Sequence, residues 1–485
     1  MKPTDDLFQL IHSLTASEKR QFKIYASKHV IGKKNNYELL FDSIVKLPTD
    51  TAYDEALFKQ QNKNKSFVKY FADEKKHLME ILVAGLTSFK INEENDLELS
   101  IQQLLREADF FRQKRLINLR LKSLQKAFAL AEKHELFQQQ IEIINHQFST
   151  LIENKQEHFS QLQNQFDEQL QSLTEKQQQL NLLQFYAHKS LLLLRIDFNG
   201  KPTNALTSNE FLEIPVIKNY QVGTSHRIDI SYFSILSRIE RANGRKEKQN
   251  FYNQKIYECF ERNDFLKKTN SLNYRTSTYN YLNSLLNLDD FKTFEKVLTA
   301  YKNIPIQNKD EAGEQWQNTT AIEVLYLLNA GKYELASTKY KEVLDGLKTY
   351  AHKVNNATKI VLLSNLAVCL FIDKQYDKTI VLNNMILEDS SDVRLDLKRD
   401  ALFLEILLHY QLTNYSLIES LLRSIKRKPY SASEKLCLQF FEKALKAGEV
   451  SKTFAKEGLE SFRAAGFETS TKTFALLCMW LESYL

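Results

Sequence analysis

Glycine and proline are scarce in this chain. Its 485 residues include 11 glycines and 6 prolines. Tight β-hairpin turns depend on these residues, so their scarcity argues against a β-rich fold. Leucine, lysine, glutamate, glutamine and alanine dominate the long stretches between them, and all five favour helices. The composition therefore predicts an all-α protein, and 43% hydrophobic residues is enough for a substantial core.

Cysteine is also scarce, and the four residues lie far apart without a CxxC pair: Cys259, Cys369, Cys437 and Cys478. Disulfide frameworks and zinc sites use paired spacings, so we expect buried free thiols in a reducing compartment. The first residues, MKPTDDLFQLIHSL, carry acids before a short apolar stripe, where a secretion signal has a basic region. These features predict a cytoplasmic protein.

Long apolar runs and an excess of one charge are missing too. The most apolar run, 191–196, is interrupted by Arg195, whereas a membrane span requires about 20 apolar residues. We therefore expect no transmembrane helix and no membrane partner. The 66 basic and 60 acidic residues give a net charge of +6, which permits nucleic acid as a partner without implying it.

Catalytic and phosphate-binding motifs are absent from the sequence. It contains no GxGxxG, Walker A, HExxH or GxSxG pattern. The nearest phosphate-loop fragment, NGKPT at 199–203, lacks the earlier glycine and places Pro202 where a helix N-terminus should donate amides. His134 and His146 are not at the spacing that puts two metal ligands on one helix face. We therefore assign no catalytic, cofactor-binding or metal-binding residue and expect no enzyme.

Residues 1–92 have the pattern of a compact unit of five helices, an N-terminal helical bundle. Thr15 and Glu18 match the S/T-x-x-E capping box of a helix start. Apolar or aromatic residues recur at helical spacing along the unit. They are Leu7, Leu10, Ile11, Leu14, Phe22, Tyr25, Ala26, His29, Tyr37, Leu40, Phe41, Ile44, Phe67, Phe71, Leu78, Leu82, Leu86 and Phe89.

Residues 93–196 predict longer helices that form glutamine-rich hairpins. Apolar residues recur there at spacings of three, four and seven, at Phe159, Leu162, Phe166, Leu173 and Leu180. This stripe is typical of an intramolecular helix pair or of a short coiled coil with a partner. We favour the intramolecular hairpin, because Gln169 and Gln177 occupy positions where a heptad needs apolar residues.

Residues 197–228 interrupt the helical pattern. Gly200, Pro202, Pro215 and Gly223 cluster in this stretch, which predicts an irregular connecting loop. Such a loop on a helical scaffold is either a hinge between arrays or a binding loop, and we favour the hinge.

Residues 229–485 repeat one layout. The segments LLNLDDFKTFEKVLTAY, LLNAGKYELASTKYKEVL, LFIDKQYDKTIVLNNMIL and HYQLTNYSLIESLLRSI each join an apolar helix end, a polar turn, an aromatic residue and an amphipathic helix. The turn aromatics, Phe291, Tyr333, Tyr376 and Tyr415, are separated by 42, 43 and 39 residues by subtraction. A single helical hairpin cannot bury its apolar face, so we expect several hairpins to stack in series. If the Tyr376 ring fills a crevice between helices, its truncation to alanine should cost about 3 kcal/mol.

The stretch GKYELASTKYKEVL resembles the turn and second helix of a TPR repeat, with Gly331, Tyr333 and Ala336 at matching positions. The first-helix signature of the TPR family is matched only loosely, and the period exceeds the family's about 34 residues, so the repeats are TPR-like. The segments SEKRQFKIYAS and LEIPVIKNYQ, followed by these hairpins, resemble a broad uncharacterised group of bacterial helical-repeat proteins. The resemblance implies a right-handed α-solenoid whose inner face, lined by the first helices, binds a peptide or protein partner.

Two basic sets in residues 1–92 raise an alternative. Their members are Lys19, Arg20, Lys23, Lys28, Lys33, Lys34, Lys59, Lys63, Lys65 and Lys69. Basic helices in front of a TPR-like sensor would suit a transcriptional or nucleic-acid-binding regulator. Interspersed acids and the lack of an arginine or asparagine cluster favour a solvated surface instead.

A third basic set lies near Gly244, at a predicted hairpin turn: Arg238, Arg241, Arg245, Lys246 and Lys248. The three arginines have the spacing of one helix face and could clamp an acidic partner. Cations near a helix C-terminus also interact favourably with the helix dipole, and we prefer that interpretation.

Three functions therefore remain open: a non-catalytic protein-interaction scaffold, which we favour, a nucleic-acid-binding regulator, and an enzyme assembled from residues distant in sequence. A protein or peptide partner is expected, nucleic acid is not favoured, and no cofactor is expected. The partner-binding residues and the oligomeric state are left open.

Overall fold

The computed structural model describes the chain at residues 6–27, 35–48, 53–90, 97–153, 159–199, 206–306, 309–351, 353–425, 432–448, 450–466 and 472–485. All regular secondary structure in these ranges is helical, which confirms the predicted all-α class. Contacts within the chain divide it into two compact units, residues 1–177 and 178–485.

The first unit begins with the helices α1 (Asp6–Ser13), α2 (Ala16–Ser27), α3 (Asn36–Val45), α4 (Glu55–Gln61) and α5 (Phe71–Lys90), with a 3-10 helix at Ser66–Tyr70. The predicted apolar stripes of these helices share one hydrophobic core, where Ile11 and Phe22 are fully buried. The predicted capping box is confirmed: the Thr15 amide donates to the Glu18 carboxylate at 2.8 Å, and the Glu18 amide donates to Thr15 Oγ1 at 3.2 Å. Local periodicity therefore predicted this core correctly.

A few predicted core positions differ or fall outside the description. Phe67 is fully buried but belongs to the 3-10 helix before α5, not to the long helix itself. His29 and the Phe89 side chain lie outside the described residues.

The first unit continues with longer helices, α6 (Leu97–Gln113), α7 (Ile117–Lys133), α8 (Phe137–Glu153) and α9 (Phe159–Asn199), and the division between the units falls within α9. Helix α6 packs on α7, and α7 packs on α8. The rings of Phe148 on α8 and Phe166 on α9 lie 5.8 Å apart, so α9 has an intramolecular neighbour. Leu173 and Leu180 are buried, while the side chains of Phe159 and Leu162 lie outside the described residues.

The second unit contains the end of α9 and the remaining helices. The bounds are α10 (Ser208–Glu213), α11 (Pro215–Lys218), α12 (His226–Ala242), α13 (Lys246–Glu261), α14 (Asp264–Thr269), α15 (Ser271–Leu286), α16 (Phe291–Lys302), α17 (Lys309–Asn329), α18 (Tyr333–Ser337), α19 (Tyr340–Thr349), α20 (Asn356–Ile372), α21 (Tyr376–Leu387), α22 (Leu395–Gln411), α23 (Tyr415–Ile425), α24 (Ala432–Ala447), α25 (Lys452–Ala464) and α26 (Lys472–Glu482). The stretch predicted as a connecting loop, 197–228, thus includes two short helices, α10 and α11.

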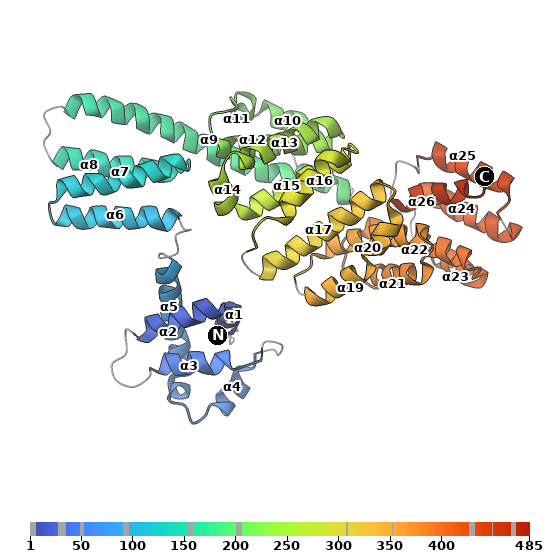
Figure 1. The fold of residues 1–485 in the computed structure, drawn as a ribbon, viewed down its shortest axis with the longest axis horizontal. Helices are drawn as coiled ribbons and strands as arrows, with labels where there is room; N and C mark the ends of the chain where they lie inside the picture. The colour runs from blue at the N-terminus through green and yellow to red at the C-terminus, as the bar shows by residue number, and fades with distance from the viewer. Residues whose placement is uncertain are drawn as a thin grey trace. The chain divides into compact units, whose positions relative to one another are not determined.

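Helices α12 to α23 are arranged as consecutive hairpins (Figure 1). The two helices of a hairpin contact each other in the pairs α12–α13, α15–α16, α17–α18, α20–α21 and α22–α23. The first helices of successive hairpins also touch, in the pairs α15–α17, α17–α20 and α20–α22. Each hairpin therefore buries apolar surface against the next, and one hydrophobic cluster extends from Phe233 to Leu481.

Every hairpin turn in this series has the same backbone geometry. Two or three residues after the end of the first helix, one residue has a positive φ, between 55° and 70°: Gly244, Asp289, Gly331, Lys374 and Thr413. The amide of the following residue then donates to a carbonyl five residues earlier, as in the bond from Lys332 to Leu327 at 2.8 Å. This is the Schellman ending of a helix. The separations of these turns are 45, 42, 43 and 39 residues by subtraction, which places an additional hairpin, α12–α13, before the four found in the sequence.

The predicted turn aromatics begin the second helices: Phe291 begins α16, Tyr333 begins α18, Tyr376 begins α21 and Tyr415 begins α23. Their rings are half-buried or partly exposed and not enclosed in the core. The residue three positions later is fully buried in each hairpin, at Phe294, Ala336, Thr379 and Ile418. A small residue, as at Ala336, is therefore only one of several side chains that fill this position.

The last helix, α26, packs against α20 and α22, which are both first helices of hairpins. The ring of Phe474 lies 5.6 Å from that of Phe403 on α22, and Trp480 lies 5.5 Å from Tyr410. Helix α20 is correspondingly buried without a break from Leu362 to Phe371. The chain's own C-terminal helix thus covers part of the first helices near this end of the unit.

All four cysteines are buried, as predicted. Burial raises the pKa of the Cys369 thiol to about 12. Each side chain packs as a small hydrophobic residue in the second unit.

Candidate functional site

A groove of about 530 Å³, lined by both polar and apolar side chains, lies in the second unit between α12 and α15. Both helices pack against α13, which contributes Gln249 and Asn253 to the lining. Helix α9 closes one side with Gln184 and His188. All lining residues belong to the second unit, so the groove is a property of that unit alone.

Helix α12 contributes a straight polar stripe to the groove. Arg227, Ser231, Ser234, Arg238 and Arg241 all line it, at successive spacings of four, three, four and three residues. This spacing places side chains on one face of a helix. The opposite face of α12 is buried and holds Phe233 and Leu236 together with the carboxylates Asp229 and Glu240, so the packing of the helix fixes which way the arginine stripe points.

Helix α15 contributes a stripe of amides and hydroxyls. Asn273, Thr276, Ser277 and Asn280 line the groove at helical spacing. Between Ser271 and Leu286 this helix has no acidic residue. The α15 wall is therefore rich in hydrogen-bonding groups but carries no negative charge.

The floor of the groove is held together by a buried hydrogen-bond chain across three helices. Ser237 on α12 donates to the Asn253 side chain on α13 at 2.6 Å. Asn253 Nδ2 in turn donates to the Asn280 carbonyl on α15 at 3.2 Å. Such a satisfied network fixes the separation of the two walls before any ligand arrives.

The groove has a net positive lining, because it includes three arginines and no aspartate or glutamate. Arg238 is half-buried, and its Nη1 donates to the Ala187 carbonyl at 2.5 Å and to Ser190 Oγ at 3.2 Å. Neither acceptor is charged. Burial lowers the pKa of Arg238 to about 10, yet the guanidinium stays protonated at neutral pH. Among the described residues, neither Arg238 nor Arg241 forms an ion pair.

The two carboxylates of α12 are engaged elsewhere. Asp229 is buried and accepts hydrogen bonds from Tyr220 Oη at 2.6 Å and from the Gly223 amide at 3.1 Å. Glu240 is buried and pairs with Arg245 at 3.4 Å. The two carboxylates on the same helix as Arg238 and Arg241 therefore do not neutralise them.

The structure separates the five basic residues noted near Gly244. Arg238 and Arg241 line the groove, whereas Arg245 lies in the turn after α12 and pairs with Glu240. Arg241 belongs to the last turn of α12, where the helix dipole favours a cation. Arg238 precedes that turn, so the dipole does not account for it. The sequence signal that identifies the groove is the polar stripe on α12, not the basic cluster as a whole.

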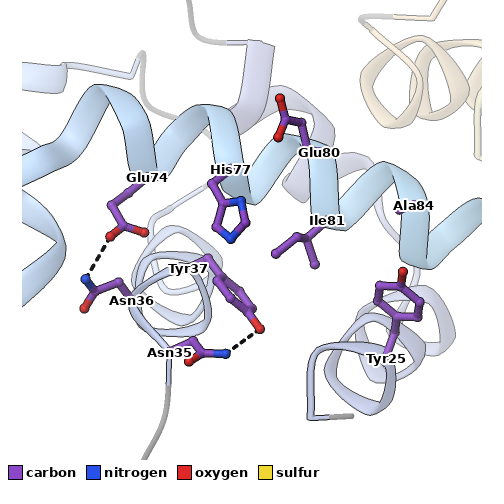
Figure 2. A pocket seen from close by; sticks show the side chains of 9 residues that line it. All are labelled: Tyr25, Asn35, Asn36, Tyr37, Glu74, His77, Glu80, Ile81 and Ala84. Carbon is purple, nitrogen blue, oxygen red and sulfur yellow. Dashed lines mark hydrogen bonds between the residues drawn. The ribbon is translucent and has the colours of Figure 1, made fainter. Parts of the chain in front are cut away.

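A second pocket, of about 720 Å³, lies between α2, α3 and α5 in the first unit (Figure 2). Its polar groups bond to one another: Asn36 donates to Glu74 at 2.8 Å, and Asn35 donates to Tyr37 Oη at 2.6 Å. The His77 ring meets Tyr37 edge-on at 5.4 Å. The lining contains two glutamates and neither lysine nor arginine, so this pocket has the opposite charge character to the groove.

The basic sets of the first unit are partly neutralised. Lys23 pairs with Asp42 at 2.7 Å, and Lys59 pairs with Glu55 at 2.7 Å. Glu55 also binds Lys75 at 2.9 Å. Lys28, Lys33 and Lys34 lie outside the described residues. These pairs neutralise two of the basic residues in the sets, Lys23 and Lys59.

Within the described ranges, no group of three or more histidine, cysteine, aspartate or glutamate side chains is arranged to hold a metal ion. In the same ranges, every helix is too short or too polar for a bilayer crossing.

The comparisons with known proteins give no relative for this chain. No family model, no curated protein and no solved structure matches it.

Proposed function

We propose that the protein is a non-catalytic interaction scaffold of the cytoplasm that binds a peptide or protein segment in the groove between α12 and α15. In this proposal the hairpins of the second unit form a right-handed TPR-like α-solenoid, preceded by an N-terminal helical bundle. The single observation that carries the proposal is the groove itself: it has two polar walls on first helices and a preorganised floor.

The chemistry of the lining supports binding over catalysis. The groove contains no carboxylate and no thiol, and its one histidine, His188, has Nδ1 at 2.8 Å from the Gln184 carbonyl of its own helix. General acid–base or nucleophilic catalysis needs paired groups of matched pKa, which this lining lacks. Amides, hydroxyls and arginines are instead the groups that hold the backbone and side chains of a peptide.

A nucleic-acid-binding regulator is the weaker proposal. It would rely on the basic helices of the first unit, and Lys23 and Lys59 there are already paired with acids. The pocket in that unit includes two glutamates and no lysine or arginine.

The test is selection of peptides from a random heptapeptide display library on the immobilised full-length chain. Enriched peptides are then measured by fluorescence anisotropy against Ser277→Trp, which fills the groove, and Thr299→Trp, which places the same ring on the exposed surface of α16. We expect binding to weaken at least tenfold with Ser277→Trp and to be unchanged with Thr299→Trp. Failure to enrich any peptide, or equal binding to both variants, would contradict the proposal.

A further inference from the structure

We infer that the groove takes an acidic peptide segment, with Arg238 and Arg241 receiving its carboxylates and the α15 wall binding its backbone. This inference rests on the proposed function, because it names the chemical class of the partner that the same groove would accept.

The first step of the argument is the uncompensated charge. A guanidinium withdrawn from water needs a counter-ion or several strong acceptors to offset its desolvation. Arg238 has two neutral acceptors, both reached from Nη1, and it forms no ion pair among the described residues. The Nε and Nη2 groups of Arg238 have no protein acceptor among the described residues. A ligand carboxylate would supply the missing charge and accept from this free edge, as planar arginine and carboxylate groups do in bidentate pairs.

The second step is the position of the neighbouring cation. Arg241 lies three residues after Arg238 on the same face of α12 and is exposed. Its guanidinium forms no hydrogen bond or ion pair among the described residues. Two adjacent arginines, one half-buried and one at the rim, therefore offer successive contacts to one strongly acidic segment and steer its approach.

The third step is the opposite wall. The side-chain amides of Asn273 and Asn280 and the hydroxyl of Ser277 make no hydrogen bond within the described residues. An asparagine amide has a donor and an acceptor side by side, which complements a peptide group. The rise from Asn273 to Asn280 is about 10 Å, the length of about three residues of extended chain.

The fourth step separates a peptide from a nucleic acid. Single-stranded nucleic acid is held mainly by aromatic side chains on which bases stack, with cations along the backbone. The groove has no phenylalanine, tyrosine or tryptophan, and its one aromatic ring, that of His188, has Nδ1 at 2.8 Å from the Gln184 carbonyl of its own helix. The lining therefore suits carboxylates on an extended peptide better than stacked bases.

The experiment compares two heptapeptides that carry a neutral fluorophore. One alternates glutamate with serine, and the other replaces each glutamate by glutamine. Alternation places all carboxylates on one side of an extended chain. Each is made with a free and with an amidated C-terminus, so that side-chain and terminal carboxylates are distinguished as the source of charge. Binding is followed by anisotropy at low and moderate salt.

The variants are Arg241→Gln and Arg238→Gln, with Lys248→Gln as the matched control. Lys248 is exposed on α13 outside the groove and loses the same charge. Unfolding midpoints confirm that each variant is folded, and Arg241→Gln keeps the test valid if the half-buried Arg238 is needed for folding. We expect the glutamate peptide to bind at least tenfold more tightly than the glutamine peptide, and each arginine variant to weaken it five- to tenfold.

Several outcomes overturn the inference. Equal binding of the two peptides, or equal effects of Arg241→Gln and Lys248→Gln, would show that the groove arginines do not select carboxylates. Stronger binding of an oligothymidylate than of the glutamate peptide would assign the groove to nucleic acid. If library selection enriches neutral or basic peptides whose binding is lost in Ser277→Trp, the scaffold proposal stands and only the inference of an acidic partner fails. If Ser277→Trp weakens the binding of no peptide, the scaffold proposal and the inference both fail.

Discussion

Thr413 and Gly331 occupy the same left-handed backbone conformation at equivalent turns, with φ values of 58° and 69°. Glycine adopts this region freely, whereas a β-branched residue is strained there. Two of the five equivalent turns therefore use glycine, and three hold other residues in a less favourable state.

We expect Thr413→Gly to raise the free energy of unfolding by about 0.5–1 kcal/mol, because relief of left-handed strain exceeds the added entropy of the unfolded chain. Gly331→Ala should lower it by about 1 kcal/mol for the opposite reason. Urea denaturation followed by tryptophan fluorescence is the measurement. Trp316 and Trp480 are the chain's 2 tryptophans, so the signal comes from the second unit alone. A destabilised Thr413→Gly would show that the turn is not strained.

The Tyr376 ring packs on Phe371 with centroids 5.4 Å apart but is only half-buried. We therefore expect Tyr376→Ala to cost about 1–2 kcal/mol, less than the about 3 kcal/mol of a fully enclosed ring. Phe294→Ala is the comparison, because Phe294 is fully buried and stacks on Tyr326 at 4.9 Å. Phe294→Ala should lower the free energy of unfolding by about 3–5 kcal/mol. The same fluorescence measurement applies, and equal losses for the two variants would contradict this ranking.

Arg120 is 1% exposed in the first unit and pairs with Glu153 at 3.1 Å. Glu153 also binds Arg112 at 2.6 Å. Removal of Glu153 leaves the buried Arg120 charge without its partner, so Glu153→Gln should lower the free energy of unfolding by about 1–2 kcal/mol. The loss is limited because Glu153 is itself exposed. Arg120→Met removes the buried charge and should change stability by less than about 1 kcal/mol.

Hydrogen exchange of the α7 and α8 amides, read by mass spectrometry, tests this pair of variants, since the first unit has no tryptophan. We expect faster exchange in Glu153→Gln than in Arg120→Met. The reverse order would mean that loss of the Arg120 side chain costs more than leaving its buried charge without Glu153, which contradicts the prediction.

Asp389 ties α20 to α22. Its side chain is 7% exposed and binds Lys359 at 3.0 Å and Lys398 at 2.9 Å. Hydrogen bonds from Ser391 and these lysines hold the pKa of this carboxyl well below its usual range. A carboxyl with a lowered folded pKa stabilises the fold above its unfolded pKa, about 3.9, and this contribution is lost as the pH falls further.

We therefore expect the urea midpoint of the second unit to drop between about pH 5 and pH 2 in the wild type. Asp389→Asn should lose about 1–2 kcal/mol at pH 7 and show a smaller drop over the same range. Asp377→Asn, on the exposed first turn of α21, is the control. If Asp389→Asn keeps the full pH dependence, this carboxylate is not its source.

Helix positions and the repeat register were predictable from the sequence. Phe291, Tyr333 and Tyr376 were identified by their spacing, and each begins a second helix. The Thr15–Glu18 capping box was predicted as it occurs. These features depend on contacts within a few residues, so local sequence is sufficient to specify them. The hairpin α12–α13 was missed as a repeat because Lys246 stands where the other turns have an aromatic residue.

The candidate groove was not predictable in the same way. The sequence drew attention to Arg238 and Arg241 but assigned them to the helix dipole. Their lack of ion pairs became visible only once Asp229 and Glu240 were found to be engaged elsewhere. Similarly, nothing local indicated that α26 would cover α20 and α22.

The sequence by itself determined the class of the protein, its helices, its turns and the period of its hairpins, because each follows from composition or from periodicity over one or two helical turns. The tertiary structure alone decided which polar stripe faces a groove and which charges stay without a counter-ion. Those properties depend on side chains from α9, α12 and α15, whose separation along the chain exceeds the range over which local sequence constrains geometry.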